Sequence, residues 1–163
     1  MRRNAGFSLL ELLVVVAIIS IPLVMYPRFR VEGLELTRLT DDTVHLLQRA
    51  RFEAIKRNEP TFVKIDKDSG TIKLYVDSNN SGGLDGDDLL LQKITTSDYK
   101  APLVINGSSF AVIRWTPQGL PQKENGALGA GRITLGWQGK PLKKTACISA
   151  AGRVRVHNGG SCS

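Results

Sequence analysis

The first hydrophobic segment of the chain runs from Phe7 to Pro27 and contains a single charged residue, Glu11. A helix of about 20 apolar residues can cross the roughly 30 Å hydrocarbon core of a bilayer. The pattern therefore predicts a membrane-spanning helix over residues 7–27. Two of the first three residues are arginines. By the positive-inside rule they keep the N-terminus in the cytoplasm and place the rest of the chain across the membrane.

A second helical pattern follows, over residues 32–58, with apolar side chains at three- and four-residue steps along one face. This helix is expected to end before Pro60, with Asn58 in a left-handed cap. Pro27 and Gly33 predict a bend between a membrane half and a soluble half of one long helix. The predicted buried face comprises Leu36, Leu39, Thr43, Leu47, Ala50 and Ala54.

The remainder of the chain alternates between apolar and polar positions, as half-buried strands do. A helix followed only by strands predicts an α+β fold in which the helix lies on an antiparallel sheet. Residues 116–131 are rich in Gly, Pro and Gln without a periodic pattern, and predict a mobile surface loop. The predicted strands are 61–66, 71–76, 89–94, 110–115, 132–137, 144–149 and 153–157.

Charge is distributed unevenly along the chain. The net charge is +7, and residues 111–163 contain eight Lys or Arg against one acidic residue, Glu124. The whole excess therefore lies in the last third, which indicates an anionic partner such as nucleic acid, lipid headgroups or an acidic protein surface. A sheet face made soluble by its basic side chains is the alternative at this point.

The N-terminus resembles the class III signal of type IV pilins and type II secretion pseudopilins. "MRRNAG" matches the short basic leader that ends in Gly, and "FSLLELLVVVAII" matches the start of the apolar helix. The resemblance implies that a prepilin peptidase cuts between Gly6 and Phe7 and methylates the new Phe7 amine. Glu11 would then pair with the amine of a neighbouring subunit during assembly, which offsets the cost of a carboxylate in lipid. The prolines depart from the family pattern, since Pro22 and Pro27 fall at mature positions 16 and 21.

The soluble part is similar to the GspH/FimT family of minor pilins and pseudopilins, through "ARFEAIKRNEPTFVKI", "WTPQGLP", "GRITL" and "AAGRVRV". The resemblance implies a type IV pilin-like fold with a leader (1–6), a transmembrane and filament-core helix (7–27) and a globular domain (28–163). It also implies a single-pass inner-membrane protein with a periplasmic domain, which later joins an extracellular filament. Its partners would be membrane lipid, the major pilin and other minor pilins near the filament tip.

The C-terminal segment "CISAAGRVRVHNGGSC" predicts a β-hairpin whose three-residue loop ends at Gly152. In that register Ala146, Ile148, Val154 and Val156 pack inward. The opposite face, expected to be exposed, carries Thr145, Cys147, Ser149, Arg153, Arg155 and His157. Because the flexible tail can return Cys162 to Cys147 in an oxidising compartment, we expect a disulfide between them.

Arg153 and Arg155 would stand about 6.6 Å apart on one side of the hairpin, suited to phosphate oxygens. "GRVR" also resembles the Gly-Arg-x-Arg motif through which some FimT-type minor pilins bind DNA in natural transformation. The sequence therefore predicts binding of double-stranded DNA without sequence preference by Gly152, Arg153 and Arg155, extended by Lys140, Lys143 and Lys144. The alternatives are arginines that only cover a sheet or contact neighbouring subunits, and a type II secretion minor pseudopilin with a purely structural tip role.

Other chemistry finds little support in the sequence. No catalytic motif surrounds His45 or His157, so we expect no enzymatic activity and no obligatory cofactor. The segment 77–88, "DSNNSGGLDGDD", resembles a calcium loop in its spacing, with candidate ligands Asp77, Asn79, Ser81 and Asp88. It joins strands rather than helices, however, and acidic hairpin tips are common for other reasons.

Overall fold

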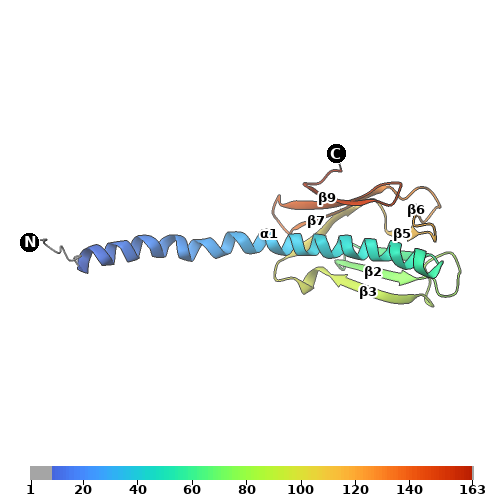
Figure 1. Cartoon of the computed structure of the whole chain (residues 1–163), viewed down its shortest axis with the longest axis horizontal. Coiled ribbons are helices and arrows are strands. Elements are labelled where there is room, and N and C mark those ends of the chain that lie inside the picture. Colours follow the sequence, from blue (N-terminus) through green and yellow to red (C-terminus); the bar gives the residue numbers. More distant parts are fainter. Residues whose placement is uncertain (1–8, 163) are drawn as a thin grey trace, which may run out of the picture. The chain divides into compact units, whose positions relative to one another are not determined.

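The computed structural model describes residues 9–162, and at residues 21–32 it describes the backbone alone. The chain divides into two compact units, residues 1–34 and 35–163, each of which is described by itself. Helix α1 (Leu9–Arg57) contributes to both units, so the two predicted helices form one element (Figure 1). The predicted leader and the bond between Gly6 and Phe7 lie outside the described residues.

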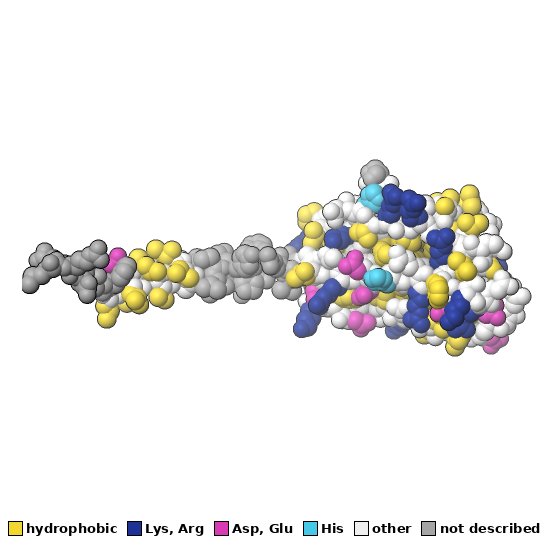
Figure 2. Space-filling view, viewed as in Figure 1, with side chains coloured by type: hydrophobic (Ala, Val, Ile, Leu, Met, Phe, Trp, Pro, Cys, Tyr) yellow, Lys and Arg dark blue, Asp and Glu magenta, His cyan; other side chains and the backbone are white. Residues whose placement is uncertain are grey.

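The first unit consists of the beginning of α1. Its described residues, 9–20 and 33–34, are all exposed, and most are hydrophobic (Figure 2). Glu11 lies in the first turn of the helix and is exposed. Among the described residues, no helix is both long enough and apolar enough to cross a membrane. The predicted span 7–27 includes positions outside those whose side chains are described.

The second unit contains two antiparallel sheets. The five-stranded sheet has the order β3-β2-β1-β5-β6, and the four-stranded sheet has the order β4-β7-β8-β9. A 3-10 turn, η1 (Thr96–Asp98), connects β3 to β4. The five-stranded sheet consists of β1 (Thr61–Asp66), β2 (Thr71–Val76), β3 (Leu89–Thr95), β5 (Val112–Trp115) and β6 (Pro121–Lys123). The four-stranded sheet consists of β4 (Leu103–Ser108), β7 (Gly131–Trp137), β8 (Lys143–Ile148) and β9 (Val154–Asn158).

Helix α1 packs its predicted apolar face against residues of both sheets. Leu36, Leu39, Leu47, Ala50 and Ala54 are at most 1% exposed and form one cluster with strand residues of both sheets. Two threonines on the same face are also buried, because each hydroxyl donates to the carbonyl four residues earlier at 2.7 Å. All buried hydrophobic residues among those described belong to this unit, which therefore has a complete core of its own.

The end of the helix confirms the sequence prediction. Asn58 has a φ of 55°, in the left-handed region that asparagine tolerates, and Pro60 follows before β1 begins. The hydroxyl of Thr61, at the start of β1, donates to the carbonyl of Ala50 at 2.9 Å. This bond connects the first strand to the helix across the turn.

Two strands differ from the prediction. β4 was not expected, and β6 lies inside the segment 116–131 that was predicted to be a mobile loop. β6 starts with Pro121 and pairs with β5 at the edge of its sheet, where a proline is tolerated. Gly129 packs so closely that a Cβ there would lie 2.8 Å from the nitrogen of Gln122. The segment therefore contains a paired strand and a closely packed glycine, while residues 124–128 are exposed. Its short strand has too few residues to show a period.

Candidate functional site

The C-terminal hairpin of β8 and β9 has the register that the sequence predicted. Ile148 pairs with Val154, and the amide of Ser149 donates to the carbonyl of Arg153 at 2.9 Å. Gly152 closes the three-residue loop with a φ of 77°, which favours glycine. A Cβ at Gly152 would also lie 2.7 Å from the carbonyl oxygen of Gly119. The turn therefore requires glycine for its conformation and for its close packing.

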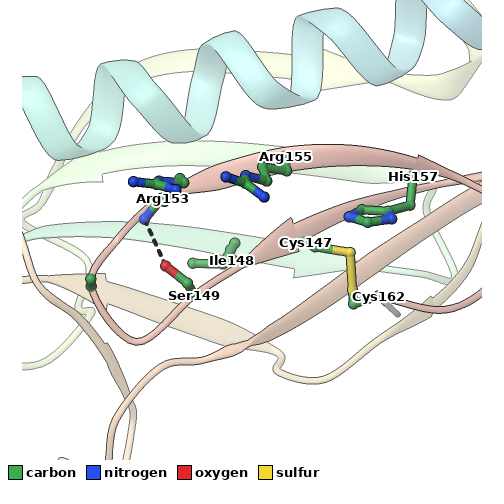
Figure 3. A pocket seen from close by; sticks show the side chains of 8 residues that line it. Cys147, Ile148, Ser149, Arg153, Arg155, His157 and Cys162 are labelled. Atoms are coloured by element: carbon green, nitrogen blue, oxygen red, sulfur yellow. Dashed lines mark hydrogen bonds between the residues drawn. A yellow bond between two sulfur atoms is a disulfide. The ribbon is translucent and has the colours of Figure 1, made fainter.

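Arg153, Arg155 and His157 follow one another on the side of β9 that faces away from the core (Figure 3). Both arginines are exposed, and neither forms an ion pair within the described part of the chain. We call this side of the four-stranded sheet the arginine face. Figure 2 shows basic side chains gathered over β9 beside a histidine. A hollow of about 570 Å³ on this face is lined by Cys147, Ile148, Ser149, Ala151, Arg153, Arg155, His157 and Cys162.

A third arginine, which the sequence analysis did not select, lies on the same face. Arg132 of β7 pairs with Cys147 of β8, and Cys147 pairs with Arg155 of β9. Arg132 is exposed, and about 9.6 Å, two strand spacings, separates its backbone from that of Arg155. The alternation of "GRITL" could have placed this arginine outward, but only the order of the strands brings it beside β8 and β9.

The predicted lysines do not line the hollow. Lys144 lies on the core side of β8, where its Nζ donates to Thr37 Oγ1 on α1 at 2.8 Å. Its inclusion in the patch was wrong, because strand alternation directs it away from Arg153 and Arg155. Lys143 begins β8, beyond the end of the hollow, and Lys140 Nζ lies 4.9 Å from the centre of the Trp137 ring.

The tail after β9 returns over the arginine face, and the predicted disulfide is present between Cys147 and Cys162 (Figure 3). Their Cα atoms are 5.8 Å apart, and 15 positions separate them in the sequence. Thr145 Oγ1 donates to the carbonyl of Gly159 at 2.6 Å. The disulfide and this bond hold the tail against β8.

The tail and the sheet edge explain three departures from the predicted faces. Cys147 was expected to be exposed but is buried, because Cys162 of the tail is bonded to it. Thr145 was expected to be exposed but is fully buried, because it contacts the returning tail and the hydroxyl of Thr134. Val156 was expected to be buried but is 41% exposed. It lies on β9, the edge strand of its sheet, which has a neighbour on one side only.

The predicted calcium ligands form a hydrogen-bonded loop of their own. The buried Asp77 carboxylate accepts the amides of Ser81 and Gly82, each at 2.9 Å. Asn79 Nδ2 donates to Asp85, and Asp88 accepts the amide of Asp85, also at 2.9 Å. Burial raises the pKa of Asp88 above its usual value. Within the described residues, no group of three or more His, Cys, Asp or Glu side chains is arranged to hold a metal.

One long helix on antiparallel sheets, with a disulfide-closed terminal hairpin, defines a type IV pilin-like fold. The family described as "Type II transport protein GspH" matches residues 39–160, and the "Prokaryotic N-terminal methylation motif" matches residues 1–24. The chain belongs to the GspH family. Its N-terminus carries the methylation motif of this class of membrane-anchored filament subunits.

Solved structures share the fold. The minor pseudopilin EpsH of the type 2 secretion system of Vibrio cholerae has 15% identity and a TM-score of 0.57 over 76% of this chain and 97% of its own. The type IV minor pilin FimU of Pseudomonas aeruginosa PAO1 has 20% identity and a TM-score of 0.60 over 80% of this chain and 97% of its own. A second crystal form of FimU aligns at 18% identity with a TM-score of 0.55, over 78% of this chain and 100% of that one. A search of functionally curated proteins found no match.

Proposed function

We propose that this protein is a minor pilin of a type IV pilus, that it assembles at or near the filament tip, and that its arginine face binds double-stranded DNA. Binding would lack sequence preference and would serve DNA uptake in natural transformation. The observation that carries this proposal is the exposure of Arg153 and Arg155, without ion pairs in the described chain, along one 570 Å³ hollow. Arg132 extends the same surface across two strands.

The chemistry of this surface fits a phosphate backbone. Guanidinium groups make paired hydrogen bonds to phosphate oxygens, and contacts to phosphates carry no sequence information. The disulfide and the Gly152 turn stabilise the strand that carries Arg153 and Arg155, so little ordering would be needed on binding. The proposal includes no catalytic role and no metal.

Assembly in this proposal follows the methylation motif. A prepilin peptidase cuts after Gly6 and methylates Phe7, and the subunit waits in the inner membrane with its globular unit in the periplasm. Glu11 then pairs with the amine of a neighbouring pilin as the filament forms. Other minor pilins and the major pilin are the partners in this step.

A salt series on the globular unit, residues 35–163, tests the DNA proposal. Binding to a duplex, measured by mobility shift, should weaken as salt rises. In a plot of the logarithm of the binding constant against that of the salt concentration, Arg153→Ala/Arg155→Ala should reduce the steepness of the slope by roughly two. Arg132→Ala should lower the slope by about one. A matched control is Lys64→Ala/Lys93→Ala, which removes two exposed charges from the other sheet. It should leave the slope unchanged.

The same experiment addresses the second candidate, a structural tip subunit of a type II secretion system. This candidate is suggested by the family description, which names type II transport, and by the structural similarity to EpsH. Absence of binding at low salt, or equal binding by the double arginine variant, would remove the DNA role of the arginine face and leave the structural candidate.

A further inference from the structure

Three lysines lie side by side on the five-stranded sheet. Lys64 pairs with Lys73 across β1 and β2, and Lys73 pairs with Lys93 across β2 and β3. Val63 and Ile65, which flank Lys64, are buried toward the core. Because side chains alternate along a strand, the three lysines share the opposite, outer face. We call them the lysine row.

The lysine row is electrostatically unfavourable in the isolated subunit. Like charges directly opposite each other on neighbouring strands destabilise a sheet. None of the three lysines forms an ion pair within the part of the chain that the structure describes. Asp66 follows on the outer face of β1, and its Oδ1 accepts the amides of Asp68 and Ser69, at 3.0 and 3.1 Å. The hydrogen bonds from Ser69 and Asp68 lower the pKa of Asp66 more than its attraction to Lys64 does. An anionic partner would remove the repulsion that these side chains retain.

A small basic hollow adjoins the row on the same face. Arg114 of β5 pairs with Phe62 of β1, two residues before Lys64. The hollow has a volume of about 150 Å³, and Lys123 and Glu124 also line it, so that two cations and one carboxylate leave a net positive charge. Arg114 Nε is buried and has no hydrogen-bond partner among the described residues. A buried donor without a partner is unfavourable, and an arginine fork matches a carboxylate.

The loop over this hollow forms an ordered wall. Gly82 lies beside the arginine, since a Cβ there would be at an ordinary contact distance, 4.0 Å, from Arg114 Nη2. Its amide is bound by the buried carboxylate of Asp77 at 2.9 Å, which holds the loop in place. The hollow is therefore bounded by glycine backbone on one side and by strand side chains on the other. Its volume is below that of typical small-molecule sites, and it suits a single anionic group.

We propose that the outer face of the five-stranded sheet binds an acidic segment of a partner protein, with one carboxylate in the Arg114 hollow and others along the lysine row. The loop that walls the hollow also carries the exposed carboxylates of Asp85 and Asp87. A nucleic acid strand, with a charge about every 3.4 Å, would meet these carboxylates. A short acidic peptide can place its few charges on the cations alone. The proposal does not depend on the arginine face.

Fluorescence anisotropy on the full-length chain in a nonionic detergent tests this surface. The probe is a labelled peptide of alternating Glu and Thr, and the matched neutral probe has Gln in place of Glu. We expect salt-dependent binding of the Glu peptide only. Lys64→Gln/Lys93→Gln should weaken binding of the Glu peptide about five- to tenfold, and Arg114→Gln should also weaken it. The control Arg153→Gln/Arg155→Gln should bind the peptide as the wild type does.

Amide chemical shifts provide a second measurement on the unmodified sequence. The Glu peptide should shift the signals of Lys64, Lys73, Lys93 and Gly82 and leave those of Arg155 unchanged. Equal binding of the Gln peptide, no binding at low salt, or equal loss in the arginine control would overturn the proposal. It would also be overturned if a 20-base-pair duplex bound this face in preference to the peptide and lost affinity in Lys64→Gln/Lys93→Gln.

Discussion

Arg51 on helix α1 donates a hydrogen bond from Nη1 to the carbonyl of Gly152, at 3.1 Å, across 101 positions of sequence. This contact connects the helix to the turn of the C-terminal hairpin. The hairpin of the arginine face is therefore positioned by the helix as well as by its own sheet.

Arg51→Ala should destabilise the globular unit by about 1–2 kcal/mol, because a half-buried hydrogen bond from a charged donor is lost and a carbonyl loses its partner. Urea unfolding followed by circular dichroism measures the change. The control is Arg49→Ala, whose exposed side chain bonds Gln92 at 3.1 Å and should cost about 0.5 kcal/mol or less. If both variants lose the same free energy of unfolding, the hydrogen bond from Arg51 to Gly152 does not stabilise the unit more than an exposed hydrogen bond does.

Gly152→Ala should cost about 2 kcal/mol or more, since it combines a left-handed φ with a contact of 2.7 Å to Gly119 O. Gly139→Ala provides the matched control. Gly139 has a similar φ of 75° but nothing within 4 Å of the added carbon, so only the conformational cost of about 1 kcal/mol applies. Denaturant midpoints compare them. If Gly139→Ala proves as harmful as Gly152→Ala, the close packing of the turn is not limiting.

Cys162→Ser should destabilise the unit by about 3 kcal/mol, the loss expected from opening a loop of this length. Thermal unfolding of the variant should match that of the wild type in a reducing agent, and the reducing agent should not change the variant. If the reducing agent leaves the melting temperature of the wild type unchanged, this prediction is wrong.

Tyr99 should make the globular unit less stable in alkali. Burial, together with the hydrogen bond that its hydroxyl donates to Asp42 at 2.6 Å, raises the pKa of Tyr99 well above its ordinary value. The neutral phenol is therefore favoured by folding. Its stabilisation is complete below the unfolded pKa near 10 and is lost as pH rises above it.

Ultraviolet titration of the globular unit should show a tyrosine that ionises only well above pH 10. Tyr99→Phe should abolish this late step and flatten the fall of stability above about pH 10. Tyr75→Phe serves as the control and should leave the late step in place. A titration in which Tyr99→Phe changes neither curve would remove the basis for this prediction.

The sequence predicted those parts of the structure that local patterns determine. The buried face of α1 followed from the spacing of Leu36, Leu39 and Leu47, and the hairpin register followed from the position of Gly152. The pairing of Cys147 with Cys162 followed from the register and the predicted compartment. The helix face and the hairpin register depend on residues that are close in sequence. The disulfide could be predicted because the chain has only two cysteines, which can pair in one way only.

The parts that the sequence did not predict depend on distant neighbours. Arg132 joins the arginine face only because β7 lies beside β8, and the lysine row exists only because β1, β2 and β3 are adjacent in that register. Lys144 is a different case, because alternation along β8 already places it on the side of the buried Ala146; only its partner on α1, Thr37, could not be known from the local pattern. Strand order is a tertiary property, and no period in a single segment reveals it.

The disulfide also has a mechanical consequence. β9 is an edge strand, and a force applied to its side chains would ordinarily peel it from β8, starting at whichever end opens first. Beyond the C-terminal end of β9 the chain is covalently joined, through Cys162, to Cys147 near the end of β8, and at the other end the turn is held by Arg51. Peeling has no free end at which to begin, so the ladder of β8 and β9 must yield as a whole. For a subunit of a filament class, this strand is a suitable place to take up tension.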